Sequence, residues 1–231
     1  LVFNANLRMD GSNQFGSNPK YRFLPIWSVS GKYTLSNEAF MQNQHLISYL
    51  AFRGSYGIQG NVDAGTSPNL VIKLGSQNSI TGMNEATIAY LPNPDLRWEK
   101  TKSFNIGCDL ALFDNRASFI LDFYKKRGSD MIMAKDVSQI NGVKTVKINA
   151  GKVNNSGIEV GANFIPLKTK NWDVTIGINY SYNNNELVDA NDRLVTLKDK
   201  INGNALVVGE AIGTLYSYDF AGLNHESGYP V

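Results

Sequence analysis

Cysteine and histidine are almost absent from the 231-residue sequence, which has one cysteine, Cys108, and two histidines, His45 and His225. A single cysteine excludes an internal disulfide framework, and neither histidine has a partner at the spacing of a zinc site. The sequence also has no G-x-S-x-G elbow and no phosphate-binding P-loop, so it supports neither a nucleophilic hydrolase nor an NTPase. We therefore predict no catalytic residue, no metal and no cofactor, and we do not expect an enzyme.

Net charge and long hydrophobic runs are scarce as well. Charged residues make up 18% of the chain and the formal net charge is +2, so there is no strong field that would favour nucleic acid as a partner. No apolar run approaches the roughly 18 residues that a membrane helix needs. The mean hydropathy of -0.24 is typical of a soluble protein, but a transmembrane β-barrel has a similar average because apolar and polar residues alternate along its strands.

Such alternation is abundant in this sequence. In the stretch 171–186, every second residue is apolar or aromatic: Trp172, Val174, Ile176, Ile178, Tyr180 and Tyr182. The residues between them are polar or small. The same pattern recurs in 1–8, 103–112, 117–124 and 158–165, with Ile120 as the exception in its segment. A period of two is the period of a β-strand, so the sequence predicts an all-β, antiparallel fold.

The expected connections between strands are of two kinds. Short turns are predicted at 113–116 and 166–171, and long polar loops at 10–20, 57–96 and around 185–210. Short turns at one end and long loops at the other are typical of an outer-membrane barrel, whose strands need about ten residues to cross the bilayer. We count roughly eight long strands, and we expect Trp172, Tyr180 and Tyr182 to lie in aromatic belts at the two membrane interfaces.

A second fold fits the alternation equally well. In a soluble or surface-attached β-sandwich, the apolar face of each strand would pack against a second sheet. The chain would then be a carbohydrate-binding module, and a second layer of protein would cover the face that lipid covers in a barrel.

Seven segments, in order, carry a resemblance to a known family: LRMDGSNQFG, SVSGKYTLSNEAFM, FRGSYGIQGN, NPDLRWEKTKSFNIGCDLALFDNRASFILDFYKKRGSDMI, NAGKVNNSGIEV, INYSYNNNEL and GEAIGTLYSYDFAGLNHESGYP. Together they resemble the barrel of a SusC/RagA-type TonB-dependent outer-membrane transporter. The segment 93–132 is the most specific. Residues 24–29 read LPIWSV where this family often has Phe-Pro-Ser-Val, a mild departure.

The resemblance implies a large plugged outer-membrane barrel of about 22 strands. Residues 1–231 would then be one partial barrel domain, without the plug domain, the energy-coupling box and the remaining strands. We expect edge strands near 1–8 and 213–221 to pair with those missing strands, since an open sheet edge cannot lie in lipid.

By the same resemblance, the protein would import glycans or peptides in the outer membrane of a Gram-negative, Bacteroidetes-like cell. A SusD-like surface lipoprotein would form the lid, TonB would supply the energy through the missing N-terminal region, and lipid and lipopolysaccharide would surround the barrel. No catalysis is implied, and the substrate-binding residues stay unknown.

Five positions on the expected strands invite a functional interpretation. Asp109, Asp122, Glu159 and Asn179 fall on the face that would line the lumen, although none is assigned as a site. Cys108 falls on the lipid-facing side, where a free thiol acts as a small hydrophobic group.

Three further features lie near strand ends. Lys125, Lys126 and Arg127 form a basic triplet that we interpret as a solvated strand end or as a contact for lipopolysaccharide phosphates. Trp98 is interpreted as an interface or packing residue rather than as a platform for a sugar.

The third feature is an acidic loop. Asp189, Asn191 and Asp192 resemble part of a calcium loop but lack its glycine and its distal glutamate, which favours a solvated loop.

Overall fold

The computed structural model describes residues 1–15, 18–191 and 194–229. Within them it forms nine strands: β1 (Val2–Gly11), β2 (Phe23–Thr34), β3 (Ile47–Asn61), β4 (Val71–Gln77), β5 (Asn84–Tyr90), β6 (Glu99–Leu112), β7 (Ala117–Asp136), β8 (Thr145–Lys168) and β9 (Asp173–Asp189). The helices are short: η1 (Pro19–Tyr21), η2 (Leu35–Asn37), η3 (Ala39–Met41), η4 (Gln139–Asn141) and α1 (Leu197–Ile201). In the described part of the chain, no helix has the length and apolar character needed to cross a membrane.

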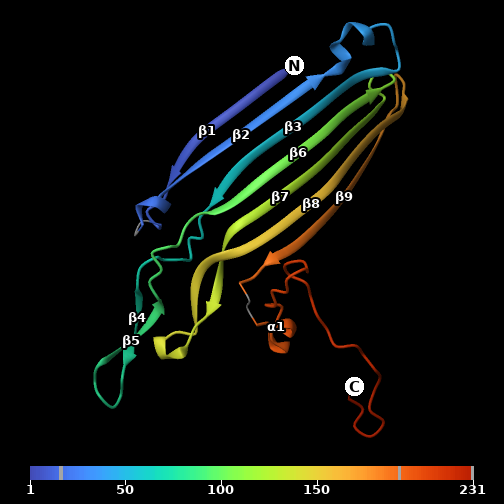
Figure 1. Ribbon diagram of the computed structural model, residues 1–231. Coiled ribbons are helices and arrows are strands. Elements are labelled where there is room, and N and C mark those ends of the chain that lie inside the picture. The colour runs from blue at the N-terminus through green and yellow to red at the C-terminus, as the bar shows by residue number, and fades with distance from the viewer. Residues whose placement is uncertain (16–17, 192–193, 230–231) are drawn as a thin grey trace.

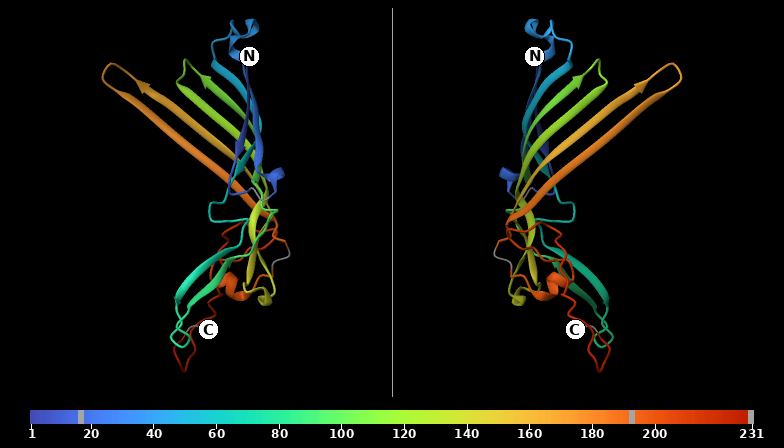
Figure 2. Two further views of the ribbon diagram at one scale, coloured as in Figure 1. Left: turned by 90° about the vertical axis from the view of Figure 1, so that its left-hand side faces the viewer. Right: turned by 90° about the vertical axis from the view of Figure 1, so that its right-hand side faces the viewer.

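Seven of the strands form one antiparallel sheet in the order β1-β2-β3-β6-β7-β8-β9. Each strand therefore lies beside its neighbour in the chain, except that the β4–β5 hairpin is inserted between β3 and β6 and hangs below the sheet (Figure 1). Two side views show that the sheet is strongly twisted, with its strands fanning apart toward one end (Figure 2). A meander of long, twisted antiparallel strands is the geometry of a barrel wall.

The two ends of the sheet differ as the sequence predicts. The fanned end, which we call the turn end, holds the connections 35–46, 113–116 and 169–172. The opposite loop end holds the long connections 12–22 and 62–98, the shorter 137–144 and the chain after 189. The four-residue connection 113–116 has positive φ angles at Phe113, Asp114 and Asn115, and Asp and Asn tolerate this region better than most residues do.

The predicted extent of the loops was partly wrong. β3 continues to Asn61, the segment 62–98 contains the β4–β5 hairpin, and β9 continues through the asparagine run to Asp189. Asn185 stays in the sheet because it pairs with Asn155 of β8, whose Oδ1 accepts a hydrogen bond from Asn185 Nδ2 at 2.6 Å. The second edge of the described sheet is thus β9, and 213–221 forms no strand.

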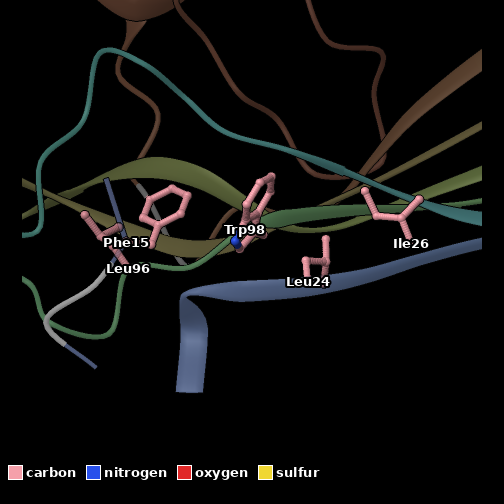
Figure 3. Packing of buried hydrophobic residues seen from close by; sticks show 5 residues of the cluster. All are labelled: Phe15, Leu24, Ile26, Leu96 and Trp98. Carbon is pink, nitrogen blue, oxygen red and sulfur yellow. The ribbon is translucent and has the colours of Figure 1, made fainter. Parts of the chain in front are cut away.

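A small apolar cluster lies at the loop end of the sheet. It consists of Phe15, Leu24, Ile26, Leu96 and Trp98 (Figure 3). Phe15 is fully buried and meets Trp98 edge-on, with ring centroids 6.2 Å apart. Of the two roles predicted for Trp98, an interface residue or a packing residue, the structure shows packing. The cluster holds two of the long loops against β2.

Candidate functional site

The register of the strands gives the sheet two chemically different faces. Residues directly opposite each other on paired strands share a face. Asp122 of β7 lies opposite Glu159 of β8, and in the next row Asp109, Ile120, Gly161 and Asn179 lie opposite one another in turn. The four residues predicted to share a face do so, and we call this side of the sheet the polar face.

The other side is the apolar face. One of its rows contains Phe52, Cys108, Leu121, Val160 and Tyr180, and the next contains Ile106, Phe123, Ile158 and Tyr182. Most of these side chains are exposed; Ile106, for example, keeps 50% of its surface accessible. The prediction that Cys108 lies on this face is confirmed. The second sheet of the described residues, β4–β5, does not cover the face, since most of these side chains remain exposed.

An ion network crosses four strands of the polar face. Arg53 of β3 lies at its centre, with Nη2 2.9 Å from Asp109 Oδ1 of β6 and 3.1 Å from Asp122 Oδ1 of β7. Lys32 of β2 completes it, with Nζ 3.4 Å from Asp109 Oδ2. Two cations and two anions balance, so the network adds no net charge to the face. The alternation in the sequence predicted that the two aspartates lie on this face. Only the pairing register of the strands shows that Lys32 and Arg53 are their partners.

Gly107 provides the space for this network. It lies between Arg53 and Asp122 in the same row. A Cβ atom at this position would lie 3.0 Å from Arg53 Nη2 and would overlap the Asp122 carboxylate. A glycine is therefore required if Arg53 is to reach across β6.

A second arrangement on the polar face centres on Tyr124. Its ring covers Gly157, where a Cβ would lie only 2.6 Å from Tyr124 Oη. The hydroxyl donates to Asn183 Oδ1 at 3.0 Å. The Lys126 ammonium lies 5.3 Å from the centroid of the Tyr124 ring, a cation–π distance. Lys126 is thus a polar-face residue.

Two shallow hollows on the polar face adjoin the ion network. One is lined by Ile120, Asp122, Glu159, Asn179 and Ser181, among others. Glu159 is exposed and makes no ion pair with any described residue. The second hollow includes Lys32, Arg53, Ser30, Ser55 and Asn105. Amide, hydroxyl and carboxylate groups in such an arrangement can hydrogen-bond the polar groups of a peptide or a sugar.

The stretch NPDLRWE, which begins the most specific segment 93–132, acts as a structural clamp. Asn149 of β8 accepts a hydrogen bond from Arg97 N and donates to the carbonyl oxygens of Arg97 and Asp130, all between 2.7 and 2.9 Å. Arg97 Nη2 lies 2.7 Å from Asp130 Oδ1. Asn93 Nδ2 donates to the Lys147 carbonyl at 2.8 Å. The sequence analysis did not predict a role for Asn149 or Asp130. Asp130 reaches the clamp because β7 has a register shift between Gly128 and Met131, which alternation along the sequence does not reveal.

The acidic loop shows no sign of a cation site in the described part of the chain. Asp189 is paired with Lys152, whose Nζ lies 2.8 Å from Asp189 Oδ2, and Asp189 Oδ1 accepts a hydrogen bond from Asn191 N at 3.0 Å. Asp192 lies outside the described residues. Among those described, no three His, Cys, Asp or Glu side chains gather closely enough to hold a metal ion.

Residues 1–227 match the family model described as TonB dependent receptor-like, beta-barrel. The chain belongs to this family. Among curated relatives, the TonB-dependent receptor P3 of Formosa agariphila is 28% identical over 99% of this chain, and the TonB-dependent receptor SusC of Bacteroides thetaiotaomicron is 26% identical over the whole of this chain. The chain spans about a quarter of the length of these relatives, 24% of each.

Solved structures agree with the fold. The RagAB peptide importer in its closed-closed state matches 99% of the chain with a TM-score of 0.82 and 27% identity, covering 25% of the matched chain. The siderophore receptor PirA of Pseudomonas aeruginosa matches 81% of this chain and 32% of its own length, with a TM-score of 0.54. At 17% identity, this match shows a likeness of fold alone. The predicted SusC/RagA resemblance and the antiparallel barrel fold are confirmed. The family is one of receptors and transporters, not a β-sandwich family or an enzyme family.

Proposed function

We propose that residues 1–231 form part of the barrel wall of a TonB-dependent importer in the outer membrane, with the apolar face toward lipid and the polar face toward the lumen. The observation that carries this proposal is the two-faced register of one uncovered sheet. Rows of exposed Ile, Leu, Phe and Tyr side chains would be unfavourable in water, whereas a lipid-facing strand requires them. The loop end would be extracellular and the turn end periplasmic.

The rest of the barrel and the plug would come from other parts of the full-length protein. Among the described residues, β1 and β9 each pair with one neighbouring strand, and the outer edge of β9 is otherwise met only near the loop end, where Leu187 exchanges backbone hydrogen bonds with Gly209 and Glu210. The rest of these two edges carries backbone groups that must find partners inside a membrane. Further strands on both edges would satisfy them and close the barrel around the polar face.

We propose a glycan or a peptide as cargo, a SusD-like surface lipoprotein as lid, and TonB as the source of energy. The similarity to SusC and to a RagAB peptide importer supports these partners. The hydroxyl, amide and carboxylate groups of the polar face suit both kinds of cargo. The host would be a Gram-negative, Bacteroidetes-like cell whose outer-membrane lipid and lipopolysaccharide surround the barrel.

A pair of substitutions on β9 tests the orientation of the wall in the full-length protein. Ile178 is on the apolar face and Asn179 on the polar face. Lysine at a lipid-facing midplane position costs about 2–4 kcal/mol, so Ile178→Lys should reduce the heat-modifiable barrel recovered from outer membranes, whereas Asn179→Lys should leave it intact. Equal recovery of the two variants, or a product found only in the aqueous fraction, would contradict the proposal.

A further inference from the structure

Three cationic side chains lie together on the apolar face near its loop end. Lys102 of β6 is directly opposite Arg127 of β7, and Lys125 lies two residues from Arg127 on the same strand face. All three are exposed. Directly opposed residues have Cβ atoms about 5 Å apart, and diagonal neighbours about 7–8 Å. One anionic group can therefore contact more than one of these cations.

This group differs from the basic triplet Lys125, Lys126 and Arg127 that the sequence predicted. Lys126, between Lys125 and Arg127, points to the polar face, where it lies over the Tyr124 ring. Its place is taken by Lys102, which is distant in sequence but adjacent in the sheet. We call Lys102, Lys125 and Arg127 the outer basic site.

The outer basic site has no internal counter-charge among the described residues. Lys100, its neighbour on β6, is paired with Asp130 at 3.2 Å, but the three cations of the site form no ion pair with a described side chain. Glu186 is in the same cross-strand row, separated from Arg127 by Asn154 of β8. The side chain of Asn154 lies between them, and Arg127 and Glu186 form no ion pair in the described part of the structure. Like charges placed opposite each other destabilise a sheet, so the site favours an anion from outside the chain.

The position of the site on the wall indicates what that anion is. The row of Lys125 also contains Phe104 and Tyr56, and Tyr56 packs against Trp27 with ring centroids 5.6 Å apart. The next row toward the turn end holds the exposed Ile106 and Phe123. The cations therefore begin where the apolar band ends, beside aromatic rings of the kind found at membrane interfaces. They are on the loop-end side of that band.

We propose that the outer basic site binds the phosphate groups of lipid in the outer leaflet. The proposal depends on the proposed orientation, with the apolar face in lipid and the loop end outside. At that depth, the long side chains can follow the apolar surface and place their charges among the headgroups. Charge-assisted hydrogen bonds from a guanidinium and two ammonium groups match a phosphate acceptor.

The test compares Lys102→Gln/Lys125→Gln/Arg127→Gln with Lys126→Gln in the full-length protein extracted in mild detergent. Lys126→Gln removes a charge of the same sign from the same strand but from the other face. Lipid A bound per protein is measured by mass spectrometry of the purified barrel, and binding of added lipid A by titration. Each cation near a lipid surface contributes about fivefold in affinity, so the triple variant should lose at least about tenfold, and Lys126→Gln should bind like the wild type.

Unchanged lipid A binding by the triple variant, or an equal loss in Lys126→Gln, would overturn the inference. Heat-modifiable migration on gels is measured for every variant, because it shows whether a closed barrel has formed. A triple variant that forms a closed barrel in the outer membrane and keeps its lipid A content refutes the outer basic site but leaves the proposed function standing. Should the triple variant not assemble, Lys102→Gln and Arg127→Gln are tested singly, and each should weaken binding about fivefold. Wild-type affinity in both would equally refute the site.

Discussion

Arg53 and Asp122 belong to strands that are not neighbours, yet their side chains meet at 3.1 Å across the intervening strand β6. Gly107 of β6 makes this possible, since it lies between them without a side chain. The pair ties β3 to β7 across β6 and lies beside both hollows of the polar face. An ion pair of this kind fixes the strands relative to each other and also shapes the surface that would face the lumen.

Gly107→Ala should destabilise the barrel. The added methyl group would overlap the Asp122 carboxylate and crowd Arg53, which breaks the contact and leaves two charges poorly paired, at a cost of about 1–3 kcal/mol. The measurement is the temperature at which the full-length barrel loses its fast-migrating form on gels. Gly54→Ala is the matched control, because a Cβ at Gly54 meets no atom within 4 Å; a similar drop in that variant would show that the effect is not due to the network.

Asn149→Ala should release the NPDLRWE clamp. The substitution removes three hydrogen bonds that tie Arg97 and Asp130 to β8, each with a net contribution of about 1 kcal/mol. Hydrogen exchange in 62–98 should accelerate while the sheet keeps its protection. Asn163→Ala removes an exposed amide from the same strand and should leave exchange in 62–98 unchanged; acceleration in both variants would contradict the role of the clamp.

Trp98→Ala should cost more than Trp172→Ala. Trp98 keeps 8% of its surface exposed and packs in the loop-end cluster, whereas Trp172 is 68% exposed. Truncating a buried tryptophan typically costs about 3–5 kcal/mol, so Trp98→Ala should lower the gel-shift temperature and expose the 12–22 and 62–98 loops to protease. Equal effects of the two substitutions would show that Trp98 is not a core residue.

Docking of the loop after β3 should weaken at acid pH. The Gly65 backbone N–H, which donates to Asp63 Oδ1 at 2.9 Å, and the Lys147 ammonium, 3.2 Å from Oδ2, together hold the pKa of Asp63 below its usual value despite its partial burial. A carboxyl group whose folded pKa is lowered stabilises the fold above its unfolded pKa, and this contribution is lost as pH falls through the folded pKa. Protection of 62–68 from hydrogen exchange should therefore persist at neutral pH and decline below about pH 4.

Asp63→Asn is the control for this pH dependence. The amide cannot titrate, so protection of 62–68 should be lower at neutral pH and should lack the acid transition of the wild type. A wild-type transition that survives in Asp63→Asn would assign the effect to another group.

The sequence predicted the two faces of β6, β7, β8 and β9 because their alternation has the period of a strand. It could not show which residues of different strands become neighbours, since this depends on register. Lys102 joins Arg127 only because the turn at 113–116 sets how β6 and β7 align. The asparagines at 183–185 have low strand propensity, and it is pairing with β8 that keeps them extended. The register shift at Asp130, and the contact of Asp130 with Arg97, could not be predicted from alternation with a period of two residues.

The central claim, that one face of this sheet meets lipid and the other the lumen, is tested most directly by spin labels placed singly along 174–182 of the full-length protein in outer-membrane vesicles. Collision rates with oxygen, which concentrates in lipid, and with a water-soluble nickel complex would be measured at each position. The account predicts that oxygen accessibility peaks at Val174, Ile176, Ile178, Tyr180 and Tyr182, and that nickel accessibility peaks at the residues between them. Equal access of the nickel complex to both sets, or the opposite phase, would contradict it.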